Sequence, residues 1–148
     1  MTELRQVAGE DIYKYSNLFA LALSEATPPF VEMTDVKKEK VLKEIRSKNM
    51  TGWLVYDKEE TLLAIAITKI VEDKCLETKD LLIYCGYGLN KVSLKTWDEA
   101  FKAMAAYGLD QKCTSMTAYS CVDKVKQMAV KMGGNADMVY LNIPLKGK

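Results

Sequence analysis

The chain has 148 residues, of which 49% are apolar and 28% charged, and its 21 basic and 20 acidic residues leave a formal charge of +1. This length and composition predict one globular domain, and the balanced charge argues against nucleic-acid binding through a broad positive field. Because the chain contains no histidine, Ser-His-Asp triads, Cys-His dyads, histidine general bases and His-ligated zinc are all excluded.

The first half of the chain predicts two helices followed by an antiparallel meander. Residues 10–25 carry a helical apolar stripe, and a second helix begins at a Thr34 or Asp35 cap and ends near Asn49. A short opening strand around residues 4–7 is a further option. Three apolar runs then follow, separated by connections short enough for hairpins, at residues 53–56, 62–71 and 76–85.

The second half of the chain predicts alternating helices and strands. Thr96 to Glu99 fits a capping box for a helix that ends near Gly108, and residues 113–120 alternate like a half-buried strand. Another helix stops at Gly133-Gly134, and "DMVYLNIPL" (137–145) predicts a closing strand. The order α-α-β-β-β-α-β-α-β predicts an α/β fold, in which a mixed sheet carries helices on both faces.

No segment indicates membrane insertion, secretion or metal binding. No stretch reaches the roughly 18 apolar residues of a membrane span, and the N-terminal residues carry charges where a signal peptide needs an apolar segment. We therefore expect a cytoplasmic protein. The cysteines have no metal-ligand spacing and predict buried thiols at Cys75, Cys85, Cys113 and Cys121.

The stretch "LLIYCGYGLNK" (81–91) places Gly86-Tyr87-Gly88 directly after an apolar run. Two interpretations stay open for these glycines. They predict either a phosphate-binding loop, in which bare backbone approaches an anion, or the point where a strand bends away from its neighbour.

Three antiparallel strands followed by strand-loop-helix-strand-helix-strand resemble the GNAT family of N-acetyltransferases. The resemblance is strongest to short GNAT-like proteins encoded by bacteriophages. It covers residues 50–145 and rests on "TGWLVYDKEETLLAIAITKI", "WDEAFKAMAAYGLDQKCTSMTAY" and "VDKVKQMAVKMGG". The resemblance implies a single GNAT-like domain over residues 1–148, with an acetyl-CoA site where two neighbouring parallel strands separate.

The cofactor loop departs from the pattern of the family. In GNAT proteins, backbone amides of an Arg/Gln-x-x-Gly-x-Gly/Ala loop hold the pyrophosphate at the start of a helix. Here position 83 is isoleucine and the glycines come before the loop. If CoA binds, the resemblance implies that the contacts come from Ile83, Cys85, Lys91, Val92, Ser93 and Lys95.

The catalytic residues of the family are also incompletely matched. Many members protonate the leaving thiolate with a tyrosine four residues before the glycine of the last helix, but here that position is Ala129. For the general base, the resemblance implies a carboxylate on the third meander strand, and Glu77 and Asp80 are the candidates. Both are alternatively solvated hairpin charges. Tyr84 and Tyr87 either line an acceptor cleft or belong to the half-buried core.

These departures favour a phage-encoded GNAT-fold protein with a degenerate acetyl-CoA site. We expect it to need no cofactor and to act as a non-catalytic binding or virion-associated structural component. Its partners would be proteins of a phage or host assembly, in the host cytoplasm or packaged in a virion, and an oligomer is an option. The loop at residues 28–31 and the segment "VYLNIPL" are the candidate interaction surfaces. Two alternatives stay open: an active acyl-CoA-dependent N-acetyltransferase with a divergent pyrophosphate loop, and a small-molecule binder without turnover.

Overall fold

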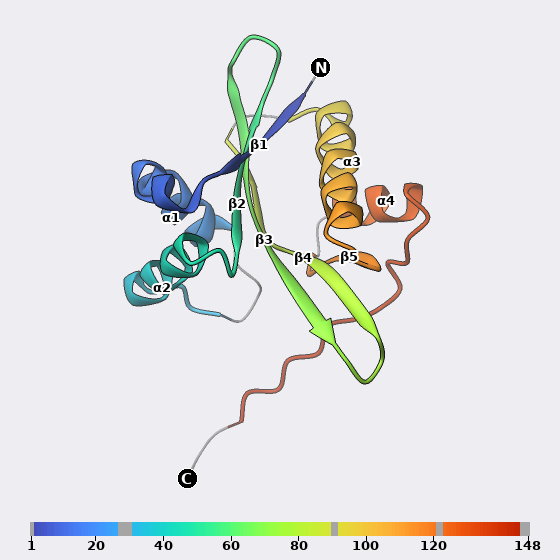
Figure 1. Cartoon of the computed structure of the whole chain (residues 1–148). Helices are drawn as coiled ribbons and strands as arrows, with labels where there is room; N and C mark the ends of the chain where they lie inside the picture. The colour runs from blue at the N-terminus through green and yellow to red at the C-terminus, as the bar shows by residue number, and fades with distance from the viewer. Residues whose placement is uncertain (1, 27–30, 90–91, 121–122, 146–148) are drawn as a thin grey trace. The chain divides into compact units, whose positions relative to one another are not determined.

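The computed structural model describes residues 2–26, 31–89, 92–120 and 123–145 (Figure 1). The chain forms two compact units, Met1–Ala118 and Tyr119–Lys148. The first contains the sheet, and the second contains one helix and the C-terminal segment. None of the helices in the described part of the chain is long and apolar enough to cross a membrane.

The first unit is built on a five-stranded mixed sheet in the order β1-β2-β3-β4-β5. Its strands are β1 (Glu3–Val7), β2 (Thr51–Tyr56), β3 (Leu62–Asp73), β4 (Thr78–Gly88) and β5 (Ser115–Ala118). The first four are antiparallel neighbours, whereas β5 runs parallel to β4. The predicted meander, the optional opening strand and the mixed α/β class are therefore confirmed.

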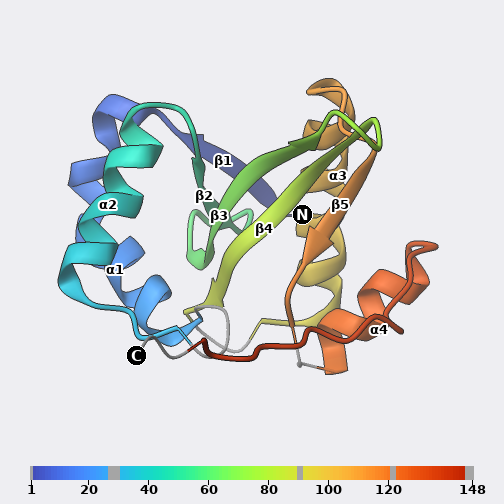
Figure 2. The same ribbon diagram turned by 90° about the horizontal axis from the view of Figure 1, so that it is seen from below.

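Helices cover both faces of this sheet, as Figures 1 and 2 show. One face carries the 3₁₀ helix η1 (Gly9–Tyr15), α1 (Ser16–Glu25) and α2 (Asp35–Arg46), and the other carries α3 (Leu94–Asp110). The first helix was expected to be continuous, but its first half is a 3₁₀ helix. The chain approaches α2 closely where this 3₁₀ helix begins, because a Cβ at Gly9 would lie 2.7 Å from the Arg46 carbonyl oxygen at the end of α2. The Thr34 cap is confirmed, since its hydroxyl accepts from the Lys37 amide at 3.2 Å.

Two apolar clusters hold these layers together. The larger one fills the space between the sheet and α1 and α2, and the smaller one lies under α3 around Trp53, Leu81 and Met104. Trp53 is nearly fully buried, and its indole N–H donates to the Thr68 hydroxyl at 2.9 Å. Thr68, the one buried polar side chain among the described residues, is thus hydrogen-bonded, as burial requires.

Helix α3 begins earlier than the predicted capping box. Ser93 is its N-cap, and the Ser93 hydroxyl accepts from the Thr96 amide at 3.2 Å. Glu99 instead accepts from the Thr2 backbone N–H at 2.6 Å. The capping box at residues 96–99 was therefore wrong. Glu99 lies beyond the first turn of α3, and its donor is Thr2, the residue just before β1.

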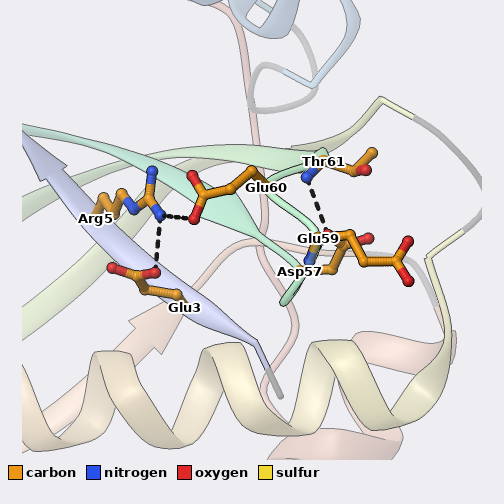
Figure 3. A network of polar contacts seen from close by, with 6 residues as sticks. All are labelled: Glu3, Arg5, Asp57, Glu59, Glu60 and Thr61. Carbon is orange, nitrogen blue, oxygen red and sulfur yellow. Dashed lines mark hydrogen bonds and ion pairs between the residues drawn. The ribbon is translucent and has the colours of Figure 1, made fainter.

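A polar network at the edge of the sheet joins β1 to the turn between β2 and β3 (Figure 3). The Arg5 guanidinium donates to Glu3 at 2.9 Å and to Glu60 at 2.6 Å, and it lies 4.3 Å from the centre of the Tyr56 ring. In the turn itself, an Asp57 carboxylate oxygen accepts from the backbone amides of residues 59 and 61. These contacts stabilise a short edge strand that has only one neighbour.

The second unit contains α4 (Asp123–Lys131) and no strand within its described residues. The predicted helix stop is confirmed, because Gly133 has φ +84° and the Gly134 amide donates to the Ala129 carbonyl at 2.7 Å. The closing strand at 137–145 was wrong. The described backbone at 137–145 has no regular secondary structure, and apolar alternation alone does not form a strand.

The cysteines follow the prediction of buried thiols only in part. Cys85 is buried and Cys113 is half-buried, but Cys75 is exposed, and Cys121 lies outside the described residues. Cys75 is exposed because it sits in the β3–β4 turn, where an Asp73 carboxylate oxygen accepts from its backbone amide at 3.0 Å. A sequence pattern of apolar neighbours does not reveal such a turn.

Candidate functional site

The C-terminal half of β4 contains a β-bulge. Ile67 of β3 pairs with Cys85 and the next residue, Thr68, pairs with Ile83, so that Tyr84 is an extra residue with no partner in this register. A bulge removes the extra residue from the regular ladder and bends the strand. The backbone of β4 is therefore irregular at Tyr84.

The parallel partner of β4 ends at the same place. The pairing of β4 with β5 runs from Asp80↔Ser115 to Ile83↔Ala118, whereas β4 continues to Gly88 and pairs there only with β3. Figure 2 shows the two ribbons diverging beyond this point. Among the described strands, the outer backbone edge of β4 from Tyr84 onward is unpaired. Of the two interpretations of Gly86-Tyr87-Gly88, this arrangement favours the strand that bends away from its neighbour.

This end of β4 also has a bare backbone. Gly86 pairs with Ala66 and Gly88 with Ala64, so small residues face one another across β3 and β4. A Cβ at Gly86 would meet only the Ile83 Cγ2 atom, at 3.9 Å. The fold therefore leaves room for a side chain at Gly86. Packing within the fold does not require glycine there, yet the strand has a bare backbone at this position.

The N-terminus of α3 follows β4 in the chain. The first amides of a helix, here those of Leu94 and Lys95, have no acceptor within the helix, and the helix dipole is positive at this end. Among the predicted contacts, Ser93 caps the helix, Lys95 is exposed, and the Val92 side chain is buried, which leaves its backbone as the group able to reach a ligand. Lys91 lies outside the described residues.

Cys85 ties α1 to β4 immediately after the bulge. Its thiol donates to the Ala22 carbonyl oxygen at 3.3 Å, and burial raises the pKa of this thiol to about 12. A thiol with that pKa stays protonated at neutral pH and is a poor nucleophile. Cys85 is therefore poorly suited to form an acyl-cysteine.

Tyr84 and Tyr87 pack, partly buried, against the apolar cluster beneath α1 and α2. This packing favours the interpretation of the two tyrosines as half-buried core. Ile83 is half-buried and forms the last pair with β5, so its backbone marks the boundary between the regular and irregular parts of β4.

The two predicted general bases lie at the other end of β4. Glu77 is in the β3–β4 turn with φ +55°, and the Asp80 carboxylate accepts from the Ser115 hydroxyl at 2.6 Å. Asp80 precedes Tyr84 by four residues, which corresponds to roughly 13 Å along a strand. The structure does not bring Glu77 or Asp80 together with the bulge. Sequence reasoning could not locate the bulge itself, although the glycines near it were a signal that this strand ends irregularly.

The described parts of the chain contain no cluster of metal-ligating side chains. The side chains described there include no group of three or more Cys, Asp and Glu residues that could hold an ion. The groups available at the open end of β4 are backbone amides and carbonyls, the α3 N-terminus and neighbouring side chains.

No family profile and no curated protein sequence matches the chain. Solved structures do match over nearly its full length. A probable acetyltransferase is 15% identical with a TM-score of 0.71, covering 99% of this chain and 98% of its own. AAC(6')-Iy, solved with the bisubstrate analogue CoA-S-monomethyl-acetylneamine, is 12% identical with a TM-score of 0.71, covering 99% of both chains. A predicted acetyltransferase from Clostridium acetobutylicum, solved with acetyl-CoA, is 11% identical with a TM-score of 0.67, covering 96% of both chains. With its mixed five-stranded sheet and the divergence of β4 from β5, the chain has the GNAT-like fold of N-acetyltransferases.

Proposed function

We propose that the chain binds an acyl-CoA along the open edge of β4 and transfers the acetyl group to a primary amine. The observation that carries this proposal is the coincidence of the bulge at Tyr84 with the last β4–β5 pair at Ile83 and Ala118. A closed, fully paired β4 would leave no backbone for a cofactor to contact.

Each part of an acyl-CoA has a matching group in the first unit. The amides of a pantetheine arm can pair with a free strand edge in the way an added β-strand does. A thioester carbonyl at the bulge would accept from backbone N–H groups near Tyr84, which stabilise the oxyanion of the tetrahedral intermediate. The pyrophosphate would lie at the N-terminus of α3, with Lys95 as a nearby cation. Two structural neighbours solved with a CoA analogue and with acetyl-CoA support this choice of ligand.

A non-catalytic binding component is the second candidate, and specific observations favour it. The loop departs from the family pattern, no tyrosine occurs on α4, and Glu77 and Asp80 lie at the far end of β4 from the bulge. Encoding by a phage and a place in a virion rest on the sequence resemblance alone and stay predictions. This second function requires a protein partner and does not require CoA binding.

Calorimetric titration with acetyl-CoA separates the two candidates. We expect micromolar binding by the wild type and its loss in Gly86→Val, because a branched side chain there would crowd the exposed face of β4 beside its free edge while the fold has room for it. Thr117→Val, an exposed change on β5, is the matched control and should bind as the wild type does. No heat at millimolar acetyl-CoA would contradict the transferase and leave the non-catalytic candidate.

A further inference from the structure

Helix α1 crosses the sheet toward the open edge of β4. Gly52, Ile67 and Cys85 form one row across β2, β3 and β4. Phe19 lies over the β2 end of this row, since a Cβ at Gly52 would be 2.9 Å from its Cζ atom. Ala22 lies over the β4 end, where its carbonyl accepts from the Cys85 thiol.

Glu25 is the next residue in this progression. Each step of three residues turns a helix by about 60° in the same sense and advances it by about 4.5 Å. Phe19 lies over β2 and Ala22 over β4. One further step of three residues leads to Glu25, toward the outer edge of β4 beyond Ile83, where β5 no longer pairs. Glu25 shares this flank of the helix with Leu18 and Leu21, at the spacing of helix neighbours.

The flank is apolar apart from this one carboxylate. Leu18 is half-buried and Leu21 is 42% exposed, a large share for a leucine beside a core. Glu25 is exposed, and its side chain makes no hydrogen bond or ion pair with any other described residue. It also ends α1, whose last turn carries no basic residue. A carboxylate there opposes the negative end of the helix dipole, so the fold gains nothing from it.

We propose that Glu25 is the catalytic general base of the transfer and that, with Leu18 and Leu21, it selects an acceptor amine attached to an apolar body. This inference rests on the proposed function. The ammonium of the acceptor would lie against the carboxylate, and its apolar body along the two leucines. A locally unfavourable residue beside a candidate site is the kind of position at which function outweighs stability.

The transfer step balances with these groups. The Glu25 carboxylate takes one proton from the R-NH₃⁺ acceptor, and the freed nitrogen lone pair attacks the thioester carbonyl carbon. Collapse of the tetrahedral intermediate completes the C–N bond and breaks the C–S bond. The second proton of the nitrogen ends on the departing CoA sulfur, and Glu25 returns its proton to solvent. The products are the N-acetylated amine, CoA-SH and one proton.

The test measures CoA release from acetyl-CoA with tyramine, an amine on an apolar body, and with spermidine, a polycation. We expect the wild type to prefer tyramine and Glu25→Gln to lose about 100-fold or more in kcat, the scale of a lost general base. The dissociation constant of acetyl-CoA, measured by calorimetry, should stay within about 2-fold, because Glu25 faces the acceptor. The matched control is Glu32→Gln, an exposed carboxylate just before α2, which should leave both quantities unchanged.

The outcomes are distinguishable. A Glu25→Gln enzyme that keeps wild-type turnover would overturn the inference while the transferase stands. Acetyl-CoA binding without release of CoA in the presence of tyramine would overturn the assigned acceptor class. Absence of acetyl-CoA binding by the wild type would remove the proposed function and this inference with it. Loss of folding is not expected, since removing a charge from this helix end should raise the Tm by about 1–3 °C.

Discussion

The two ends of β4 differ in how their backbone is used. From Asp80 to Ile83 the strand pairs on both sides, and its polar side chains serve the structure, as the Asp80–Ser115 hydrogen bond shows. Beyond Ile83 the strand carries a bulge and two glycines, and β3 is its only partner among the described strands. We therefore expect chemistry at the irregular end of the strand rather than at the end richer in carboxylates.

The largest expected effect is on stability, at the regular end. Leu81 is fully buried and lies close to Gly108 of α3. Leu81→Ala should lower the free energy of unfolding by about 2–5 kcal/mol, because it removes core contacts and leaves a cavity. Urea unfolding measures the change, and Leu76→Ala, at a position 74% exposed, is the control, expected to stay within about 0.5 kcal/mol. Equal losses in the two variants would show that the regular end is not the packed one.

The second prediction concerns pH and the irregular end. The pKa of Cys85 is raised from 9.0 to about 12 by burial, so in this range the unfolded chain binds fewer protons than the folded one. Stability should therefore fall as the pH rises from 9 toward 12, and Cys85→Ala should reduce this dependence. Thermal unfolding across that range measures this pH dependence.

The burial of Cys85 also predicts its reactivity. In wild type at pH 8, alkylation followed by mass spectrometry should label the exposed Cys75 well before Cys85. Equal labelling rates would contradict the burial argument.

The third prediction separates strain from catalysis in the β3–β4 turn. Glu77 holds φ +55°, a conformation that costs a non-glycine residue about 1 kcal/mol. Glu77→Gly should therefore raise the Tm by a few degrees at most and leave acetyl transfer unchanged. A large loss of activity, with acetyl-CoA binding intact, would restore Glu77 as a candidate base and reverse the assignment of the two ends.

The smallest effect is expected at Asp80. Its carboxylate contacts the Ser115 hydroxyl at the surface, so Asp80→Asn should cost less than about 1 kcal/mol and should not change kcat. Chemical unfolding and the CoA-release assay give the two numbers from one preparation. A loss of 100-fold in kcat without a change in stability would place the base on β4 and exclude Glu25 from that role.

Much of the fold could be predicted because its signals are local. Apolar periodicity located the two early helices and the three meander strands, and the Thr34 cap followed from its own side chain and the helix it precedes. The predictions that failed were those that depend on a partner. Thr96 has the right neighbours for a cap, yet Ser93 takes that role, and the apolar alternation at 137–145 does not form a strand.

The candidate site was predicted less well than the fold. The resemblance placed Ile83 and Cys85 at the expected cofactor site, and the bulge at Tyr84 lies between these two residues. The general bases were sought at Glu77 and Asp80, because the family resemblance implies a carboxylate on the third meander strand. Glu25 was missed because it lies 59 positions before Tyr84 in the chain, and only the crossing of α1 over the sheet suggests that the two lie near each other. An acidic residue at a helix C-terminus was the available signal.

Composition and periodicity are properties of short stretches of chain, and they were enough to predict the helices and strands between residues 35 and 131, the mixed α/β class and the absence of histidine chemistry. The end of the β4–β5 pairing, the position of the bulge in β4 and the direction of α1 across the sheet depend on the tertiary structure. Those features follow from register and packing between segments far apart in the chain. Register depends on many contacts across the sheet between distant segments, and it cannot be predicted from any one of these segments alone.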